Sequence, residues 1–296
     1  MKKKTFMNLN LISIRAIIFL FAAFPLSSSA WNWVGHELAA QVAYDQLTPE
    51  AKKYWNNVIG NLDSSYPKEN FITASILPDQ LKERGITAFN AWHYINWPVF
   101  QHFGYTKKKT WIRTLPRNPE NLSWAIHQSL AVLKNPKAKA FEKAFFAAFL
   151  IHLAADAHQP LHCADLYSSR FSRGDEGGNL WKIRSPIANN LHTYWDRGGG
   201  FLVSNLIRKN QLGISAQVLE RAYPKSYFGS KVQIVDPWIW IKESHQLAKE
   251  YVYRIRLNAV PSKSYQQKTR MLTREQIVLS GYRLGFLLNY LAANAR

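Results

Sequence analysis

Hydrophobic and polar positions along this chain recur with the spacing of α-helices over most of its length, and strand-like alternation is nearly absent. Loops are expected over 97–117 and 170–183, where aromatic, basic and glycine residues interrupt the pattern, and 91–97 reads as extended. The sequence therefore predicts an all-α fold in a single, mostly helical domain. The apolar spacing, with start and stop residues, predicts helices over 31–47, 49–60, 71–83, 119–133, 190–196, 215–222, 237–254 and 274–295, and a long one between Pro136 and Pro160.

The first thirty residues have the pattern of a secretory signal peptide. Three lysines at 2–4 precede an apolar run over 9–24, and small residues follow at 28–30. A membrane anchor is the alternative because the run approaches spanning length, but polar residues at 10, 13 and 15 interrupt it. We therefore expect a signal peptide over 1–30, one domain over 31–296 that begins at Trp31, and a secreted or periplasmic protein.

Composition limits the kind of partner. The formal net charge is +19, or +15 without the four cations of residues 1–30, and such a field favours polyanions such as nucleic acid. Solubility of an exported protein is the alternative explanation for the charge. Cys163 is the only cysteine, so no disulfide can form within the chain, and packing or bound metal must hold it together. We expect a monomer without stable membrane association once the signal peptide is removed.

Two His–Asp pairs are the strongest chemical signal in the chain. His152 and Asp156 are four residues apart on a predicted helix, so both side chains lie on one face, and His192 and Asp196 repeat this spacing. Pro160 ends the first of these helices and lets His162 approach from another direction. The pairs could instead cap helices or form buried salt bridges. Two such pairs in apolar surroundings favour metal binding.

Further ligand candidates lie upstream at His36, Asp79 and His93. Imidazole and carboxylate ligands without cysteine suit zinc, which needs three or four protein ligands. The set is too large for one ion. Sites that hold metal ions about 3.5–4 Å apart hydrolyse phosphate esters. The residues alone therefore indicate a multi-metal site for phosphate ester chemistry.

Together these motifs resemble the zinc-dependent type I nucleases, which are single-strand-specific enzymes, and the resemblance spans most of residues 31–296. The family implies an almost wholly helical fold and three Zn²⁺ ions per chain. The lack of cysteines for the disulfides of eukaryotic relatives suggests a bacterial branch. By resemblance, the first zinc is held by Asp79, His93, His152 and Asp156, the second by His162, His192 and Asp196, and the third by His36, a bridging Asp156, and the amino nitrogen and carbonyl oxygen of Trp31.

The same resemblance assigns catalytic roles to Asp79, Lys82 and Asp156, with Lys82 as a cation against the phosphate. It also implies substrate contacts. Tyr94 matches an aromatic residue that stacks on a base, and the Gly177-Gly178-Asn179 loop resembles one that hydrogen-bonds the base. Relatives carry an aspartate where this chain has Asn96, which can donate as well as accept hydrogen bonds. The base preference of relatives therefore does not transfer to this chain.

The activity implied is hydrolysis of single-stranded DNA and RNA to 5′-phosphate products, together with 3′-nucleotidase action on nucleotides. Zinc-dependent phospholipase C is the first alternative, since its fold and metal site are similar. Those lipases end the ligand set with His-x3-Glu and place the first histidine farther from the N-terminal tryptophan. Asp196 and the five-residue step from Trp31 to His36 therefore favour the nuclease. A non-catalytic protein that binds zinc or nucleic acid is a third alternative.

Overall fold

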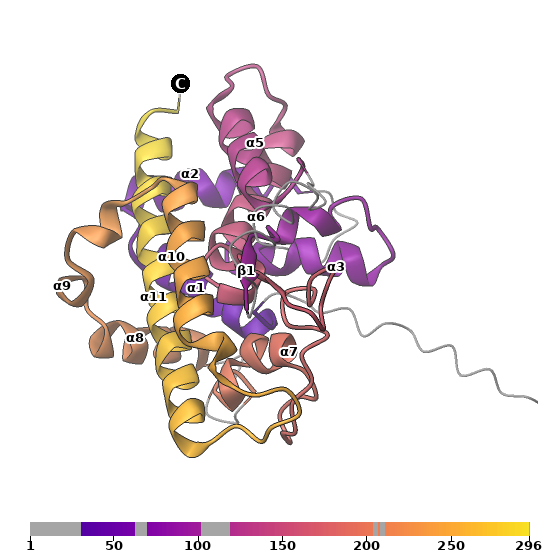
Figure 1. Cartoon of the computed structure of the whole chain (residues 1–296). Helices are drawn as coiled ribbons and strands as arrows, with labels where there is room; N and C mark the ends of the chain where they lie inside the picture. The colour runs from indigo at the N-terminus through magenta and orange to yellow at the C-terminus, as the bar shows by residue number, and fades with distance from the viewer. Residues whose placement is uncertain (1–30, 63–69, 102–118, 204–206, 208–210, 296) are drawn as a thin grey trace, which may run out of the picture.

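A computed structural model describes residues 31–62, 70–101, 119–203, 207 and 211–295. The expected signal peptide over 1–30 and most of the expected loop over 97–117 lie outside these residues, as does His102. Helices make up nearly all regular structure of the described part, as the sequence predicted (Figure 1). The α-helices are α1 (Trp33–Asp45), α2 (Pro49–Ile59), α3 (Leu77–Glu83), α5 (Leu122–Lys134), α6 (Ala140–Asp156), α7 (Leu191–Asp196), α8 (Leu212–Ala222), α9 (Lys225–Phe228), α10 (Pro237–Glu250) and α11 (Lys263–Ala293).

Short 3₁₀-helices and one small sheet complete the described fold. The two strands, β1 (Pro98–Phe100) and β2 (Asp165–Tyr167), pair in parallel with Pro98 opposite Asp165. The 3₁₀-helices are η1 (Thr73–Ile76), η2 (Asn90–His93), η3 (Pro160–His162), η4 (Gly198–Gly200), η6 (Gly229–Gln233) and η7 (Val252–Arg254).

The α6 helix lies at the centre of the molecule. It packs against α1, α2, α3, α5 and α11, and every residue from Ala147 to Asp156 is buried. A helix that is apolar on all sides belongs in a core, and the sequence of this segment has that character. His152 and Asp156 are therefore polar groups at the buried end of this helix.

The first and last α-helices cross closely beside α6. At Gly281 of α11, an added Cβ would lie 2.6 Å from the side chain of Val42 and 2.8 Å from the carbonyl oxygen of Ala39. Gly285, one turn further along α11, faces Gln46 and the carbonyl oxygen of Ala43 at similarly short range. The two glycines thus permit backbone contact between α1 and α11, and this contact fixes the position of α1.

A fully buried arginine joins three of these helices. Arg283 of α11 bonds Glu243 of α10 through Nη2 at 2.7 Å and His158, just after α6, through Nη1 at 3.0 Å. Its Nε also donates to the carbonyl oxygen of Lys231 at 3.0 Å. A buried guanidinium is tolerated when its donors are paired in this way, and breaking such a network is strongly destabilising.

Several local expectations were wrong. Residues 98–100 form β1 and not loop, and 90–93 form η2 and not an extended segment. A three-residue strand is too short for its alternation to be recognised. The predicted helix over 71–83 is η1 followed by α3, with Pro78 in the first turn of α3 as expected. The last helix begins at Lys263, eleven residues before the predicted start, after Ser262 caps it by accepting from the Tyr265 amide.

The α1–α11 crossing gives a stability prediction. We expect Gly281→Ala to lower the free energy of unfolding by about 1–3 kcal/mol, because its methyl group collides with α1. Gly213→Ala in α8 is the matched control, since nothing lies within 4 Å of its added Cβ, and it should be neutral or stabilise by up to ~1 kcal/mol. Urea unfolding of both variants, followed by circular dichroism at saturating zinc, measures the difference. Equal free energies of unfolding would contradict the packing argument.

Candidate metal centre

Asp156 lies among four imidazoles. Its Oδ1 is 3.6 Å from His36 Nε2 and 3.6 Å from His162 Nδ1. Its Oδ2 is 3.2 Å from both His93 Nδ1 and His152 Nε2. The rings of His36 and His152 are stacked with centroids 3.8 Å apart, so α1 and α6 contribute adjacent ligand candidates. All five side chains are buried.

The predicted ligand side chains fall into three groups, of which the first two share His152. In each group the potential ligand atoms lie within 4.8 Å of one another. Asp79 groups with His36 and His152, and its Oδ1 is also 3.9 Å from His93 Nδ1. The structure therefore brings all eight predicted side chains together. The groups are His36, Asp79 and His152; His93, His152 and Asp156; and His162, His192 and Asp196.

The hydrogen bonding of these side chains fits metal ligands. Buried polar groups are normally hydrogen-bonded, and each exception needs an explanation. In the part of the chain that the structure describes, five of the predicted ligands have buried nitrogen or oxygen atoms without a hydrogen-bond partner. A bound cation would supply the missing partner for each. The atoms are His36 Nδ1 and Nε2, Asp79 Oδ1, His93 Nε2, both carboxylate oxygens of Asp156, and His162 Nε2.

Backbone carbonyls orient three of the histidine rings. His152 Nδ1 lies 2.7 Å from the carbonyl oxygen of Ser75. His162 Nδ1 and His192 Nδ1 lie 2.6 Å from the carbonyl oxygens of His93 and Gly177. A proton on Nδ1 completes each bond and leaves Nε2 with a lone pair, which is how metal-binding histidines are commonly held.

Burial also favours the metal-binding form of these imidazoles. Burial, with a contribution from His152, lowers the pKa of His36 well below its usual value. Burial likewise lowers the pKa of His162, and that of His192 to about 3. At His152, burial lowers the pKa but the nearby carboxylates raise it more, to about 9. Zinc binding must therefore displace a proton from His152, while the other three rings are already neutral at pH 7.

Trp31 is anchored beside the ligand candidates. Its indole Nε1 donates to the carbonyl oxygen of Ala155 at 3.2 Å, next to Asp156 in the chain, and the whole residue is buried. The amide of the following residue, Asn32, donates to the carbonyl oxygen of Asp196 at 3.0 Å. The backbone of residues 31–32 thus contacts the segments that carry Asp156 and Asp196, as a role for Trp31 in metal binding requires.

A cavity of about 550 Å³ adjoins this cluster. His93, His162 and His192 contribute to its wall together with Lys82, Tyr94, Asn96, Gly177 and Asn179, so every predicted substrate contact lines it. Asn179 Nδ2 donates to the carbonyl oxygen of Glu176 at 2.9 Å, which holds this side chain within its own loop. The sequence analysis missed six further lining residues, which no motif identified: Asn90, Leu161, Glu176, Lys182, Asn189 and Asn190.

The remaining histidines have structural contacts. His158 Nδ1 lies 2.7 Å from the carbonyl oxygen of Ala154, and burial and Arg283 lower its pKa well below the usual value. His245 stacks on Trp97, and its Nδ1 lies 3.0 Å from the Cys163 carbonyl oxygen. His127 is exposed. Among the described residues none of the three belongs to a ligand group, and neither does the buried Cys163.

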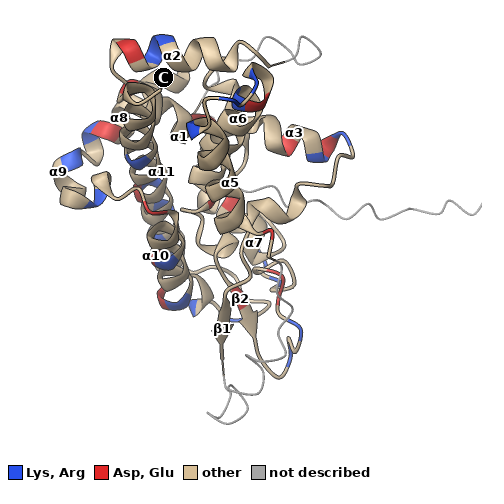
Figure 2. Ribbon diagram, turned by 90° about the horizontal axis from the view of Figure 1, so that it is seen from above, with Lys and Arg blue, Asp and Glu red and all other residues tan. Residues whose placement is uncertain are grey.

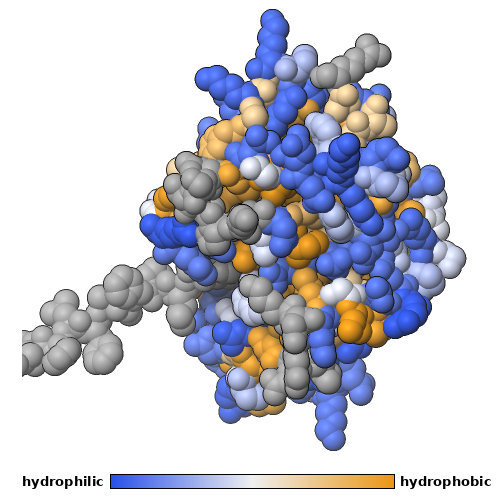
Figure 3. All heavy atoms as spheres, turned by 180° about the vertical axis from the view of Figure 1, so that it is seen from behind, coloured by the Kyte–Doolittle hydropathy of each residue, from blue (hydrophilic) through white to orange (hydrophobic). Residues whose placement is uncertain are grey.

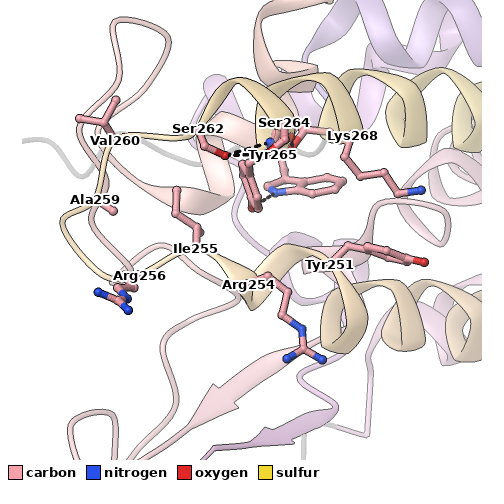
Figure 4. Close-up of a pocket in the computed structure, with 12 residues that line it drawn as sticks. Tyr251, Arg254, Ile255, Arg256, Ala259, Val260, Ser262, Ser264, Tyr265 and Lys268 are labelled. Carbon is pink, nitrogen blue, oxygen red and sulfur yellow. Dashed lines mark hydrogen bonds between the residues drawn. The ribbon is translucent and has the colours of Figure 1, made fainter.

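A second cavity, of about 460 Å³, lies between η7 and the start of α11 (Figure 4). Its wall includes Arg254, Arg256 and Lys268, with Lys268 Nζ 4.7 Å above the Tyr251 ring. Trp195 reaches it from α7, held by a 3.0 Å bond from Nε1 to the Tyr265 hydroxyl. None of the predicted ligands or substrate contacts lines this cavity, so we place the chemistry at the first.

Positive charge in the described part of the chain is spread over several elements. Lys and Arg lie on α2, α9, α10 and α11, among others (Figure 2). The face seen in Figure 3 is largely hydrophilic, with hydrophobic surface in separate patches. No described helix is long and apolar enough to cross a membrane.

Comparison with known proteins agrees with the site. The sequence model for the family described as S1/P1 nuclease matches residues 31–293. The chain belongs to the S1/P1 nuclease family. It is 22% identical over 304 positions to Endonuclease 1 of Arabidopsis thaliana, covering 94% of this chain and 92% of that relative. Membership makes the chain a nuclease, a hydrolase of phosphodiester bonds in nucleic acid, and S1/P1 nucleases are in general zinc-dependent.

The central position of Asp156 leads to a metal-binding prediction. On the three-ion ligand set that the family resemblance implies, Asp156→Ala should lose two zinc ions, because this carboxylate contacts ligand candidates of two groups. Zinc per chain, measured by elemental analysis after dialysis, tests this, with circular dichroism to confirm folding. His127→Ala is the control, since this exposed histidine should not affect zinc content. Full zinc content in Asp156→Ala would refute the ligand assignment.

Proposed function

We propose that this S1/P1 nuclease binds three zinc ions and hydrolyses single-stranded DNA and RNA to 5′-phosphate products, with 3′-nucleotidase activity. The observation that carries the proposal is the adjacency of two features. A buried cluster of imidazole and carboxylate groups with unpartnered ligand atoms adjoins a cavity lined by a lysine, a tyrosine and amide side chains. Metal ligands beside a site for phosphate and base are what this reaction needs.

The ligand set proposed from the sequence is retained. Asp79, His93, His152 and Asp156 would hold one ion, His162, His192 and Asp196 a second, and His36, Asp156 and Trp31 a third. Zinc ions bound there would lower the pKa of water toward about 7 and offset negative charge on phosphate oxygens. The dry surroundings of these side chains would strengthen both effects.

Lys82 would bind the phosphate. It lies three residues after Asp79 on α3, so the two side chains project from the same part of the helix, and it lines the cavity together with His93 and His192. Its positive charge contributes to lowering the pKa of His192, after burial and His162, which places the ammonium group in electrostatic reach of that ring. An ammonium group at this place stabilises negative charge that develops on the phosphate during hydrolysis.

Tyr94 would supply the surface on which a base stacks. Its ring is 38% exposed and lines the cavity opposite the Gly177–Asn179 loop. A base must leave its own stack to lie against this ring, and duplex pairing opposes that by a few kcal/mol. Asn96, also in the wall, can both donate to and accept from a base. This arrangement supports a preference for single strands.

Export and oligomeric state complete the proposal. Removal of residues 1–30 as a signal peptide would give Trp31 a free amino group, and its contacts place it beside Asp156 and Asp196. A free amine can coordinate zinc, whereas an amide nitrogen cannot do so without losing its proton. We further propose that the mature protein is secreted or periplasmic and acts as a monomer. N-terminal sequencing of exported protein and light scattering test these points.

The preference for single strands can be measured directly. We expect denatured DNA to be cleaved at least ~10-fold faster than the same sequence as a duplex, since unpairing and unstacking cost a few kcal/mol. Initial rates are compared by gel at a temperature and salt concentration that keep the duplex intact, with and without a zinc chelator. Phosphatidylcholine turnover serves as the assay for the phospholipase alternative. Equal rates on both DNA forms would remove the single-strand claim.

Tyr94 gives a residue-level test. Tyr94→Ala should lower kcat/KM on single-stranded oligonucleotides by about 5- to 150-fold, since stacking on an aromatic ring is worth ~1–3 kcal/mol per base. Tyr290→Ala is the matched control, because this tyrosine of α11 is 58% exposed and does not line the cavity. Zinc content should stay unchanged in both variants. Equal kcat/KM for the two would exclude stacking on Tyr94.

A further inference from the structure

Two buried aspartates lie close together, Asp165 in β2 and Asp175 in the loop of residues 174–179. Asp165 is 2% exposed, and Asp175 is fully buried. Asp175 Oδ1 accepts from the amide of Leu166, next to Asp165, and Asp165 Oδ1 accepts from the amide of Gly177, two residues after Asp175, so the carboxyl groups are neighbours. Neither forms an ion pair with any residue that the structure describes. Two ionised carboxylates in contact without a cation would repel strongly at such a place.

The hydrogen bonds of Asp175 leave room for one proton. Its Oδ1 accepts from the Leu166 amide at 2.9 Å and from the Tyr253 hydroxyl at 3.0 Å. Its Oδ2 is buried and has no donor among the described residues. A proton held between Asp165 and Asp175 satisfies this oxygen and removes the repulsion. Burial raises the pKa of Asp175 to about 7, and the charge of Asp165 adds to the rise.

Among the described residues, the other titratable groups that face the pair do not supply a counter-charge. Tyr167 of β2 and Tyr253 of η7 both have a raised pKa, caused first by burial and then by the aspartates, so both phenols are neutral. Burial raises the pKa of Tyr94, and the charges of Glu176 and Asp165 add to this. Asp165 itself has a raised pKa because of burial. A proton is therefore the available source of neutralisation.

The pair holds the loop by its backbone. The Gly177 amide donates to Asp165 Oδ1 at 3.4 Å, and the Gly178 amide bonds Asp175. Gly174 fits closely, since an added Cβ would lie 2.2 Å from Asp165 Oδ2. The Gly177 carbonyl oxygen in turn accepts from His192, so the aspartates support a predicted zinc ligand as well as the cavity wall.

The loop conformation needs such support. The φ angles of Gly174, Gly177 and Gly178 are all positive, and Glu176 has φ of 56° without being glycine. Non-glycine residues in this region are strained and persist only where the surroundings enforce them. Glu176 lines the cavity, so the enforced turn presents its side chain to whatever binds there.

We propose that Asp165 and Asp175 share one proton and act as positioning residues, holding the 174–179 loop closed against the cavity, and that the closed loop weakens when this proton is lost to solvent. The consequence for nucleic acid binding rests on the proposed function. The shared proton and the closure of the loop do not depend on that function.

The direction of the pH effect follows from linkage. In an open loop the Asp175 carboxyl would titrate near its ordinary value of about 3.9. In the closed loop its pKa is about 7. The equilibrium constant for loop closure is therefore largest below pH ~4. It falls about tenfold per pH unit up to pH ~7 and is constant above that.

Hydrogen exchange of the Gly177 and Gly178 amides measures this closure. The zinc-loaded protein is followed from about pH 5.5 to pH 8.5, with rates corrected for the intrinsic pH dependence of exchange. Protection should fall at least about tenfold between pH 5.5 and pH 7 and then level off. In Asp175→Asn and in Asp165→Asn an amide N–H replaces the shared proton, so protection should stay high and vary less than about twofold.

Two further variants make the assignment specific. Tyr253→Phe removes a donor to the ionised form of Asp175, so the fall in protection should extend to higher pH. Glu220→Gln is the matched control. Burial raises the pKa of Glu220 to about 7 as well, but this residue lies on α8 beside Gln46 and away from the loop. It should show the wild-type response. Three results would overturn the proposal. The first is a wild-type pH response of protection in Asp175→Asn, and the second is loss of that response in Glu220→Gln. The third is loss of protection of the loop amides in both Asn variants at every pH.

Kinetics then separate this inference from the proposed function. KM for single-stranded oligonucleotides should rise in the wild type as the fraction of molecules with a closed loop falls between pH 5.5 and pH 7, and stay flat in Asp175→Asn at unchanged zinc content. A loop response in exchange without cleavage of any nucleic acid would refute the proposed function and leave the proton-sharing pair intact. Cleavage of nucleic acid with no pH response of the loop amides would support the proposed function and refute the proton-sharing pair.

Discussion

The negative charge of Asp156, buried among four imidazoles, is the constraint around which the rest of the structure is arranged. The carboxylate stands at the buried end of α6, where the helix also directs its last carbonyl groups. Anionic carboxylate and helix terminus together attract cations. Burial disfavours the charged form of two neighbouring imidazoles, since it lowers the pKa of His36 and of His162. The cluster is therefore suited to bind metal ions, as S1/P1 nucleases in general do.

Several elements around the cluster hold the ligand candidates in place. Carbonyl groups of Ser75, His93 and Gly177 orient three rings from outside. Arg283 connects the segment after α6 to α10 and α11, which keeps the end of α6 in place without contact to the ligands. The cavity wall combines helical residues, such as Lys82 of α3 and His192 of α7, with the loop that carries Gly177 and Asn179. Loop residues carried on a rigid helical base are a usual arrangement for a binding site.

The sequence allowed the helical fold and the ligand types to be predicted, because both depend on local spacing. His152 with Asp156, and His192 with Asp196, were recognisable as pairs since a helix brings residues four apart onto one face. Which pair joins which ion depends on tertiary packing, and the resemblance to a family supplied that assignment. Contacts made by backbone atoms, such as the bond between the Gly177 carbonyl oxygen and His192, cannot be predicted from residue types. No motif in the sequence singled out Asp165 and Asp175, because their burial depends on η7 and β1, which lie far away in sequence.

The close crossing of α1 and α11 has a consequence for how the protein is made. Gln46, just after α1, is joined to Asn289 of α11 by a hydrogen bond that spans 243 residues of sequence. The glycine face that receives α1 is therefore made long after α1 itself. Until then α1, with His36, lacks the surface it packs on, and the core around α6 stays open to water. Folding of this domain depends on a contact between segments far apart in sequence, and such contacts form slowly because a long stretch of chain must first lose conformational freedom.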